Sequence, residues 1–273
     1  MSSTPINTAA APHAIVTGGS SGIGRAVAER LAGQGFSLTL IARRTELLER
    51  AKNELEKGGG TVGVATADVA DEANLSNVID AAQALRGPCH TLIACAGAVV
   101  PGRFENLNDA TFRRLMDVNY LGSVNAVRAV YGGMTERRAG RIGLVASAAA
   151  LIGIFGYTAY AGSKFALRGF AEALRGEAKA HGLCVTICYP GDTDTDQYAA
   201  ETSQRPAETQ AIAGAAPLAD PKRVAEAFVR GMDRGRFAVY PGLEVAALGR
   251  TASFISPLLN ARFDSLVSRF AKR

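Results

Sequence analysis

A tyrosine and a lysine four positions apart are the first residues in this sequence whose types and spacing suggest chemistry. Tyr160 and Lys164 lie in the segment TAYAGSKFALRGF, where an α-helix would place both side chains on one face. An ammonium group beside a phenol favours the phenolate, so the hydroxyl becomes a better proton donor or acceptor near neutral pH. The spacing therefore predicts an acid–base tyrosine whose pKa Lys164 lowers from its ordinary value of about 10.

Two polar residues upstream extend this pair. Ser147 follows a predicted strand, at the edge where open α/β sheets bind ligands, and its hydroxyl would hold the carbonyl oxygen that Tyr160 protonates. Asn119, in LMDVNYLGS, would hold a water that connects Lys164 to solvent. Taken singly, a chance YxxxK pair, a helix-capping serine and a satisfied core amide are the plainer interpretations. Their order and their places on successive elements favour one catalytic site.

A glycine-rich turn near the start of the chain predicts a phosphate-binding site. The segment TGGSSGIG at residues 17–24 follows an apolar run, and its glycines are spaced as TGxxxGxG. Glycine lets the backbone approach a pyrophosphate, which the N–H groups of the following helix would hold. Any tight strand–helix turn uses glycine, so the motif depends on its place after the first strand of a βαβ unit. The residues expected at the phosphates are Gly18, Ser20, Ser21, Gly22, Ile23 and Gly24.

The end of the second predicted strand indicates which dinucleotide binds. A carboxylate there would accept a hydrogen bond from the adenosine ribose and favour NAD, whereas this sequence has Arg43 and Arg44. Two guanidinium groups suit a 2′-phosphate, so we expect NADP(H), with surface arginines at a helix start as the alternative. Asp68, followed by Val69, is either a partner of the adenine amino group or a helix N-cap.

Short apolar runs alternate with longer helical patterns along most of the chain. Such strands are buried on both faces, as in a parallel sheet covered by helices. We predict an α/β fold, a Rossmann-type doubly wound parallel sheet, in a single domain over residues 13–240. A flexible segment is expected at 1–12 and a C-terminal helical extension at 241–273. The predicted strands are 13–17, 37–42, 61–66, 90–95, 141–146, 183–189 and 237–240, and the predicted helices include 22–31, 71–85, 108–131, 158–180 and 220–234.

Composition and charge exclude several functions. The chain has 273 residues, of which 48% are apolar, and its three histidines and four cysteines show neither HExxH nor CxxC spacing, so no metal site is expected. The net charge is +5, without the stacking aromatic residues among basic ones that nucleic-acid binding requires. The sequence lacks a signal-peptide pattern and any apolar run of membrane-spanning length, which predicts a cytoplasmic protein.

The C-terminal tail concentrates positive charge. Between positions 250 and 273 five basic residues accompany one acid, Asp264. A solvated helix end is the plain interpretation, and peripheral contact with an anionic membrane is the alternative. The basic residues are Arg250, Arg262, Arg269, Lys272 and Arg273.

The glycine-rich turn and the four polar residues together resemble the short-chain dehydrogenases/reductases over about residues 13–240. The resemblance implies a catalytic tetrad of Asn119, Ser147, Tyr160 and Lys164, with Lys164 also binding the nicotinamide ribose. It further implies pairing of long helices in a homodimer or homotetramer. Members usually have NNAG after the fourth strand, where this sequence has ACAG. Because both asparagines are absent, the resemblance implies that the backbone of Ala96 and Gly97 contacts the cofactor.

Other segments are similar to a narrower family, the 3-ketodihydrosphingosine reductases. These segments are FRRLMDVNYL, ERRAGRI, AGSKFALRGFAEAL, YPGDTDT and FDSLV. The similarity implies reduction of a long-chain keto lipid with NADPH. Other ketones, such as 3-oxoacyl thioesters or steroids, and a non-catalytic NADP-binding regulator are the alternatives.

The same resemblance assigns residues to the substrate side of the site. The loop after the sixth strand would line the nicotinamide with Pro190, Gly191 and Thr193, although relatives have a second proline at position 191. Relatives also carry a basic residue where Leu47 stands, so the 2′-phosphate would depend more on Arg43 and Arg44. An apolar groove for an alkyl chain is expected from the segment 192–215 together with Leu151, Ile152, Ile154 and Phe155.

Overall fold

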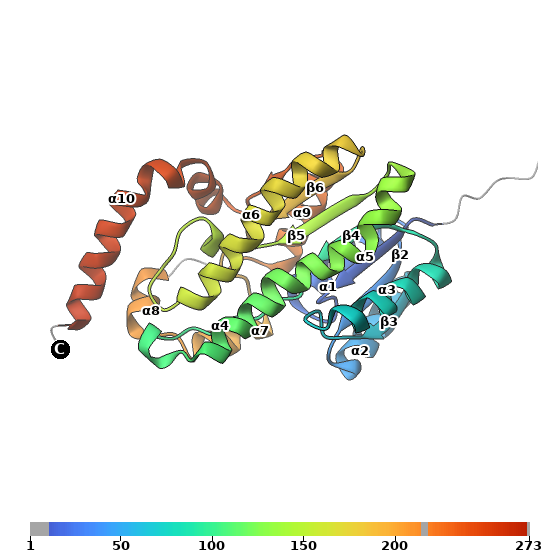
Figure 1. Cartoon of the computed structure of the whole chain (residues 1–273). Coiled ribbons are helices and arrows are strands. Elements are labelled where there is room, and N and C mark those ends of the chain that lie inside the picture. Colours follow the sequence, from blue (N-terminus) through green and yellow to red (C-terminus); the bar gives the residue numbers. More distant parts are fainter. Residues whose placement is uncertain (1–10, 214–217, 272–273) are drawn as a thin grey trace, which may run out of the picture.

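One parallel sheet organises the chain (Figure 1). A computed structural model describes residues 11–213 and 218–271, and in this part seven strands pair in the order β3-β2-β1-β4-β5-β6-β7. Most of the predicted flexible N-terminus lies outside the described residues. The order reverses at β1, which is the doubly wound arrangement, so the predicted fold class is confirmed. The strands are β1 His13–Thr17, β2 Ser37–Ala42, β3 Thr61–Thr66, β4 Cys89–Ala94, β5 Arg141–Val145, β6 Cys184–Cys188 and β7 Ala238–Val239.

Helices cover both faces of the sheet and bury its apolar side chains in two cores. Apolar residues of α3, α5 and α6 pack against one face, and those of α1, α2 and α9 pack against the other. The helices are α1 Gly22–Ala32, α2 Thr45–Lys57, α3 Glu72–Arg86, α4 Asp109–Met116, α5 Gly122–Arg137, α6 Thr158–Ala180, α7 Asp196–Thr202, α8 Ala207–Ala213, α9 Pro221–Asp233 and α10 Leu243–Ala271.

The helix predicted at 108–131 differs from the observed structure in two ways. The helical region continues to Arg137. Gly132 and Gly133 therefore lie inside α5, although glycine has a poor helix propensity. The region is also divided by a π-helical turn, Asp117–Leu121, between α4 and α5. A π-helical turn accommodates one extra residue and frequently occurs at functional sites. Here it contains Asn119.

The chain after β6 forms the short helices α7 and α8, and residues 214–217 of this segment lie outside the described part. The predicted C-terminal helical extension is confirmed as α10, which bends and runs away from the sheet (Figure 1). Pro257 lies inside α10 and cannot donate a backbone hydrogen bond. No helix among the described residues is both long and apolar enough to cross a bilayer.

Candidate active site

A cavity of about 1320 Å³ opens along the carboxyl ends of the strands. Every residue expected at the cofactor lines it, as do Ser147, Tyr160 and Lys164. Asn119 does not line the cavity and is fully buried beneath it. Gly18 and Thr193, which are far apart along the chain, therefore line one cavity, because parallel strands end on the same side of the sheet.

The glycine-rich turn packs so closely against neighbouring backbone that side chains would not fit at two of its glycines. Gly18 has φ +69°, and a Cβ there would lie 2.8 Å from the backbone nitrogen of Ala96. A Cβ on Gly24 would lie 2.3 Å from the carbonyl oxygen of Gly18. The Thr17 hydroxyl accepts hydrogen bonds of 3.2 Å from the backbone N–H groups of Cys95 and Ala96. This cradle of bare backbone at the start of α1 fits a pyrophosphate.

The two arginines after β2 both reach the cavity, on the same side as the glycine-rich turn. Arg43 is 60% exposed, and its Nη1 lies 3.8 Å from the Asp68 carboxylate. The Asp68 carboxylate also accepts hydrogen bonds from the backbone of Ala70 (3.1 Å) and from Arg114 (3.2 Å). Burial opposes ionisation of Asp68, but these donors lower its pKa below the ordinary value. The N-cap alternative for Asp68 is wrong, because Asp71 caps α3 by accepting from Asn74.

Tyr160, Lys164 and Ser147 meet at the ends of β5 and α6. The Lys164 ammonium is buried, lies 5.8 Å from the centre of the Tyr160 ring, and donates a 3.1 Å hydrogen bond to the Val145 carbonyl. The Ser147 hydroxyl accepts a 3.1 Å hydrogen bond from the backbone of Ala149, so it also caps a short turn. The capping interpretation of Ser147 is therefore confirmed, and its catalytic role stays a prediction.

The pKa of Tyr160 moves in the direction opposite to the one expected from the sequence. Desolvation raises it to about 12, and a side-chain hydrogen bond with Ser147 only partly counteracts this. Desolvation also lowers the pKa of Lys164 to about 8. The neutral phenol is consequently stabilised, and this is the protonation state that a proton donor requires.

Asn119 makes contacts within the protein that satisfy its amide. Its Oδ1 accepts a 2.7 Å hydrogen bond from the backbone N–H of Ala98, and its Nδ2 donates to the Ala98 carbonyl and to the Ser163 hydroxyl, both at 2.9 Å. A Cβ on Gly97 would lie 3.2 Å from Asn119 Oδ1 and 3.5 Å from Lys164 Nζ. Asn119 therefore anchors the segment after β4 next to Lys164, and the water-holding role stays a prediction.

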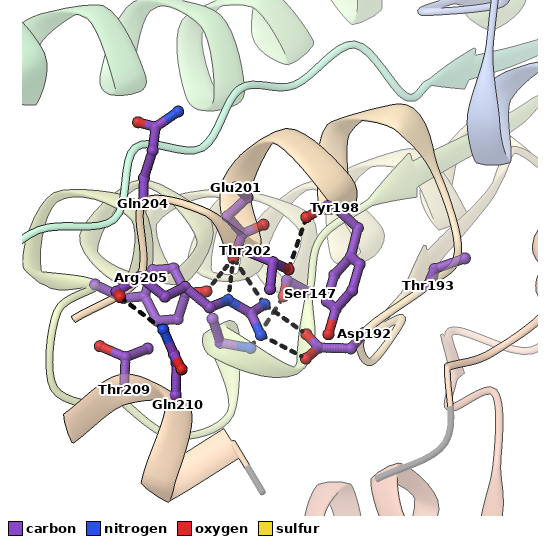
Figure 2. Close-up of polar contacts among 12 residues, drawn as sticks. Ser147, Asp192, Thr193, Tyr198, Glu201, Thr202, Gln204, Arg205, Thr209 and Gln210 are labelled. Carbon is purple, nitrogen blue, oxygen red and sulfur yellow. Dashed lines mark hydrogen bonds and ion pairs between the residues drawn. The ribbon is translucent and has the colours of Figure 1, made fainter. Parts of the chain in front are cut away.

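Sequence reasoning missed a charged cluster on the segment after β6 (Figure 2). Arg205, 5% exposed, donates to both oxygens of Asp192 at 3.0 and 3.1 Å and to Glu201 at 2.8 and 2.9 Å. Its guanidinium also lies 4.8 Å from the ring centre of Tyr198 and 5.8 Å from that of Tyr157, whose hydroxyl donates to Glu201. The available signal was composition, because Arg205 is the only basic residue between positions 191 and 219.

The predicted apolar groove is partly correct. Ile152 and Ile154 line the large cavity, but Leu151 packs into the core. Phe155 instead lines a second cavity of about 230 Å³, together with Ile154 and residues of α8 and α10. Among the described residues, no group of three or more histidine, cysteine or carboxylate side chains is arranged to hold a metal ion.

Comparisons with known proteins agree with this geometry. The short chain dehydrogenase family model matches residues 12–206. The 3-ketodihydrosphingosine reductase of Bos taurus is 46% identical over 230 residues, which are 82% of this chain and 69% of that protein.

Solved structures share the architecture. The actinorhodin polyketide ketoreductase, determined with NADPH, superposes with a TM-score of 0.79 at 27% identity and covers 88% of this chain and 97% of its own. A short-chain dehydrogenase from Burkholderia phymatum, determined with NAD, has a TM-score of 0.81 at 24% identity, covering 91% and 95% of the two chains. At that identity the second likeness concerns the fold alone.

Burial of Lys164 predicts a pH-dependent stability. Its folded pKa, about 8, lies below the unfolded value of 10.5, so between these pH values the unfolded chain binds more protons. The free energy of unfolding of the wild-type protein should therefore rise relative to Lys164→Met, by about 1–3 kcal/mol, as pH increases from 8 to 10.5. Urea unfolding across this range measures the difference. Lys179→Met, at an exposed position of the same helix, should show no such trend; a similar trend would contradict the assignment.

Proposed function

The chain belongs to the short-chain dehydrogenase family, and from this we propose that it reduces 3-ketodihydrosphingosine to dihydrosphingosine with NADPH. It is an NADP(H)-dependent oxidoreductase. The observation that supports the substrate is the 46% identity to a 3-ketodihydrosphingosine reductase, which extends over 82% of the chain. The positions of Tyr160, Ser147 and Lys164 at one cavity support the reaction type.

Each residue of the proposed tetrad has a role that its position allows. When bound, NADPH supplies the hydride that reduces the ketone carbon. Tyr160, whose phenol is neutral in this environment, donates a proton to the carbonyl oxygen, and the Ser147 hydroxyl donates a hydrogen bond to the same oxygen. Lys164 would hold the ribose hydroxyls. Asn119 positions the backbone of Ala98 and thereby the wall beside Lys164.

The alkyl chain of the substrate requires an apolar path. Ile154 lines both the large cavity and the 230 Å³ cavity, so an apolar surface extends from the reaction centre toward α10. A long-chain ketone without further groups would use the same surface, so a substrate panel must separate amino lipids from other ketones.

The catalytic assignment is tested by replacing the phenol. Purified protein with NADPH and 3-ketodihydrosphingosine should oxidise NADPH, and Tyr160→Phe should lower kcat by at least about 100-fold because the proton donor is lost. Tyr131→Phe, which removes a hydroxyl from a residue that does not line the cavity, serves as the matched control and should keep its activity. Absence of NADPH oxidation by the wild-type protein would refute the substrate. Full activity of Tyr160→Phe would refute the mechanism.

Cofactor choice is tested at the end of β2. Replacing both Arg43 and Arg44 with alanine removes the guanidinium groups expected at the 2′-phosphate. Because a hydrogen bond to a charged group contributes about 1.5–3 kcal/mol, the preference for NADPH over NADH in kcat/KM should fall about 10–100-fold. Arg50→Ala, an exposed arginine of α2, should leave the preference unchanged. An unaltered preference in the double variant would contradict the assignment.

We propose that the enzyme contacts a membrane peripherally, and the exposed residues on one face of α10 support this. Phe254 is 87% exposed and Leu258 is 74% exposed, one helical turn apart. Arg250 lies four positions before Phe254, Arg262 lies four positions after Leu258, and both arginines are also exposed. An apolar pair flanked by arginines suits the boundary of an anionic membrane, from which a lipid substrate would enter.

Vesicle flotation tests this contact. Phe254→Ser combined with Leu258→Ser should reduce binding to phosphatidylserine vesicles by at least about tenfold, because apolar surface no longer inserts. Leu85→Ser is the matched control, since Leu85 is also 74% exposed but lies on α3. Equal binding of the wild type to neutral vesicles would contradict the electrostatic part, and wild-type-like binding of the double variant would contradict the whole contact.

Assembly into a homodimer or homotetramer stays a prediction. Two large apolar side chains on neighbouring elements, Leu121 and Phe165, are 43% and 41% exposed and are where we expect subunits to meet.

A further inference from the structure

The charged cluster after β6 has the composition and position of a binding site for a cation. We infer that Asp192 and Glu201 bind the ammonium group of an α-amino ketone and so make the enzyme select amino lipids over other ketones. This inference rests on the proposed function, because it names the group by which the same site recognises its substrate.

The two carboxylates line the cavity that contains the reaction centre, while their shared partner does not. Asp192 and Glu201 line the large cavity together with Tyr160 and Ser147, whereas Arg205 is 5% exposed and lies outside its lining. Figure 2 draws Ser147 together with the Asp192–Arg205 pair. A ligand in the cavity therefore meets carboxylate oxygens rather than the guanidinium.

The charges of the cluster do not balance. Arg205 supplies one positive charge against two carboxylates, so one negative charge remains at the wall of the cavity. The side chain of Glu201 is only 10% exposed, and that of Asp192 is 38% exposed. At Glu201, which has little access to water, an uncompensated charge is unfavourable, and a cation from the substrate would compensate it.

The position of the cluster matches the structure of an α-amino ketone. In such a molecule the ammonium is carried by the carbon next to the carbonyl carbon. When Ser147 and Tyr160 hold the carbonyl oxygen, the ammonium of the bound substrate must therefore lie close to these two side chains. The two carboxylates lie close to these groups: the N–H of Ala148, the residue after Ser147, donates a 2.8 Å hydrogen bond to the carbonyl of Pro190, two residues before Asp192. The Tyr157 hydroxyl donates to Glu201, and the Tyr157 ring centre lies 5.6 Å from that of Tyr160.

The cluster also fixes the backbone, and that role alone would not discriminate between substrates. Arg205 joins the end of β6, through Asp192, to α7, through Glu201, and it packs against the rings of Tyr157 and Tyr198. Loss of a purely structural link would impair the reduction of every ketone alike. A binding role instead changes the ratio between an amino ketone and its des-amino analogue.

The test compares two ketones of equal length with purified protein and NADPH. One is 3-ketodihydrosphingosine, and the other is 1-hydroxyoctadecan-3-one, which lacks only the amino group. The wild-type protein should have at least a tenfold higher kcat/KM for the amino ketone. Asp192→Asn should lower this ratio by at least tenfold, and Asp192→Glu, which keeps the charge, should retain most of it.

The matched control is a carboxylate of the same segment. Glu208 is buried and paired with Arg103, but it does not line the large cavity. Glu208→Gln should leave the ratio unchanged. If Asp192→Asn does not fold, product inhibition of the wild-type protein gives a second measurement: dihydrosphingosine should bind at least tenfold more tightly than octadecane-1,3-diol.

The outcomes separate this inference from the proposed function. A wild-type protein that reduces neither ketone would refute the proposed function. A wild-type protein that reduces 3-ketodihydrosphingosine but shows no preference over the des-amino ketone would overturn the ammonium site alone. Equal losses on both ketones in Asp192→Asn, or equal inhibition by the amine and the diol, would overturn it as well.

Discussion

The burial of the Lys164 ammonium at the end of β5 is the interaction on which the rest of the site depends. A buried charge is tolerated only where polar partners are provided, and the Val145 carbonyl is one such partner. An ammonium has three donors, and in the proposed function the ribose hydroxyls accept from others. The same low-polarity environment keeps the Tyr160 phenol neutral. Burial at this site therefore favours the neutral form of the Tyr160 phenol, and it makes further hydrogen-bond acceptors for the Lys164 ammonium favourable.

The parallel sheet provides that environment by bringing distant segments to one edge. β4 and β5 are neighbours, so the backbone after β4 passes directly beside the end of β5. Gly97 lets this backbone approach both Asn119 and Lys164. The π-helical turn at Asp117–Leu121 places Asn119 where it can hold Ala98 through both its donor and its acceptor. The backbone at Gly97, held from beneath by one buried amide, thus forms part of the cavity wall next to Lys164.

The sequence predicted the elements whose patterns are local. The strand Ser37–Ala42 and the helix Thr158–Ala180 were predicted to the residue, because an apolar run between turn residues and a long helical periodicity each identify their own ends. The π-helical turn could not be predicted in this way, since one additional residue in a turn leaves the composition unchanged. The charged cluster was missed for a different reason. Arg205 meets Asp192 across a segment without periodicity, and such a contact depends on how α7 folds back rather than on the neighbours of either residue.

The missed cluster changes how the whole cavity is understood, because it gives the two ends opposite charge. Arg43 and Arg44 follow β2, next to the glycine-rich turn after β1, whereas Asp192 follows β6, and β1, β4 and β5 lie between these two strands. The guanidinium groups are therefore at one end of the cavity, and the net negative charge of the cluster is at the other. A dinucleotide phosphate and a substrate ammonium would each be attracted to one end and repelled by the other. Both reactants would then be oriented before they touch, with the reacting carbons between the two charged ends. Specificity for an amino lipid and preference for NADPH are in this view consequences of a single charge separation along the edge of one sheet.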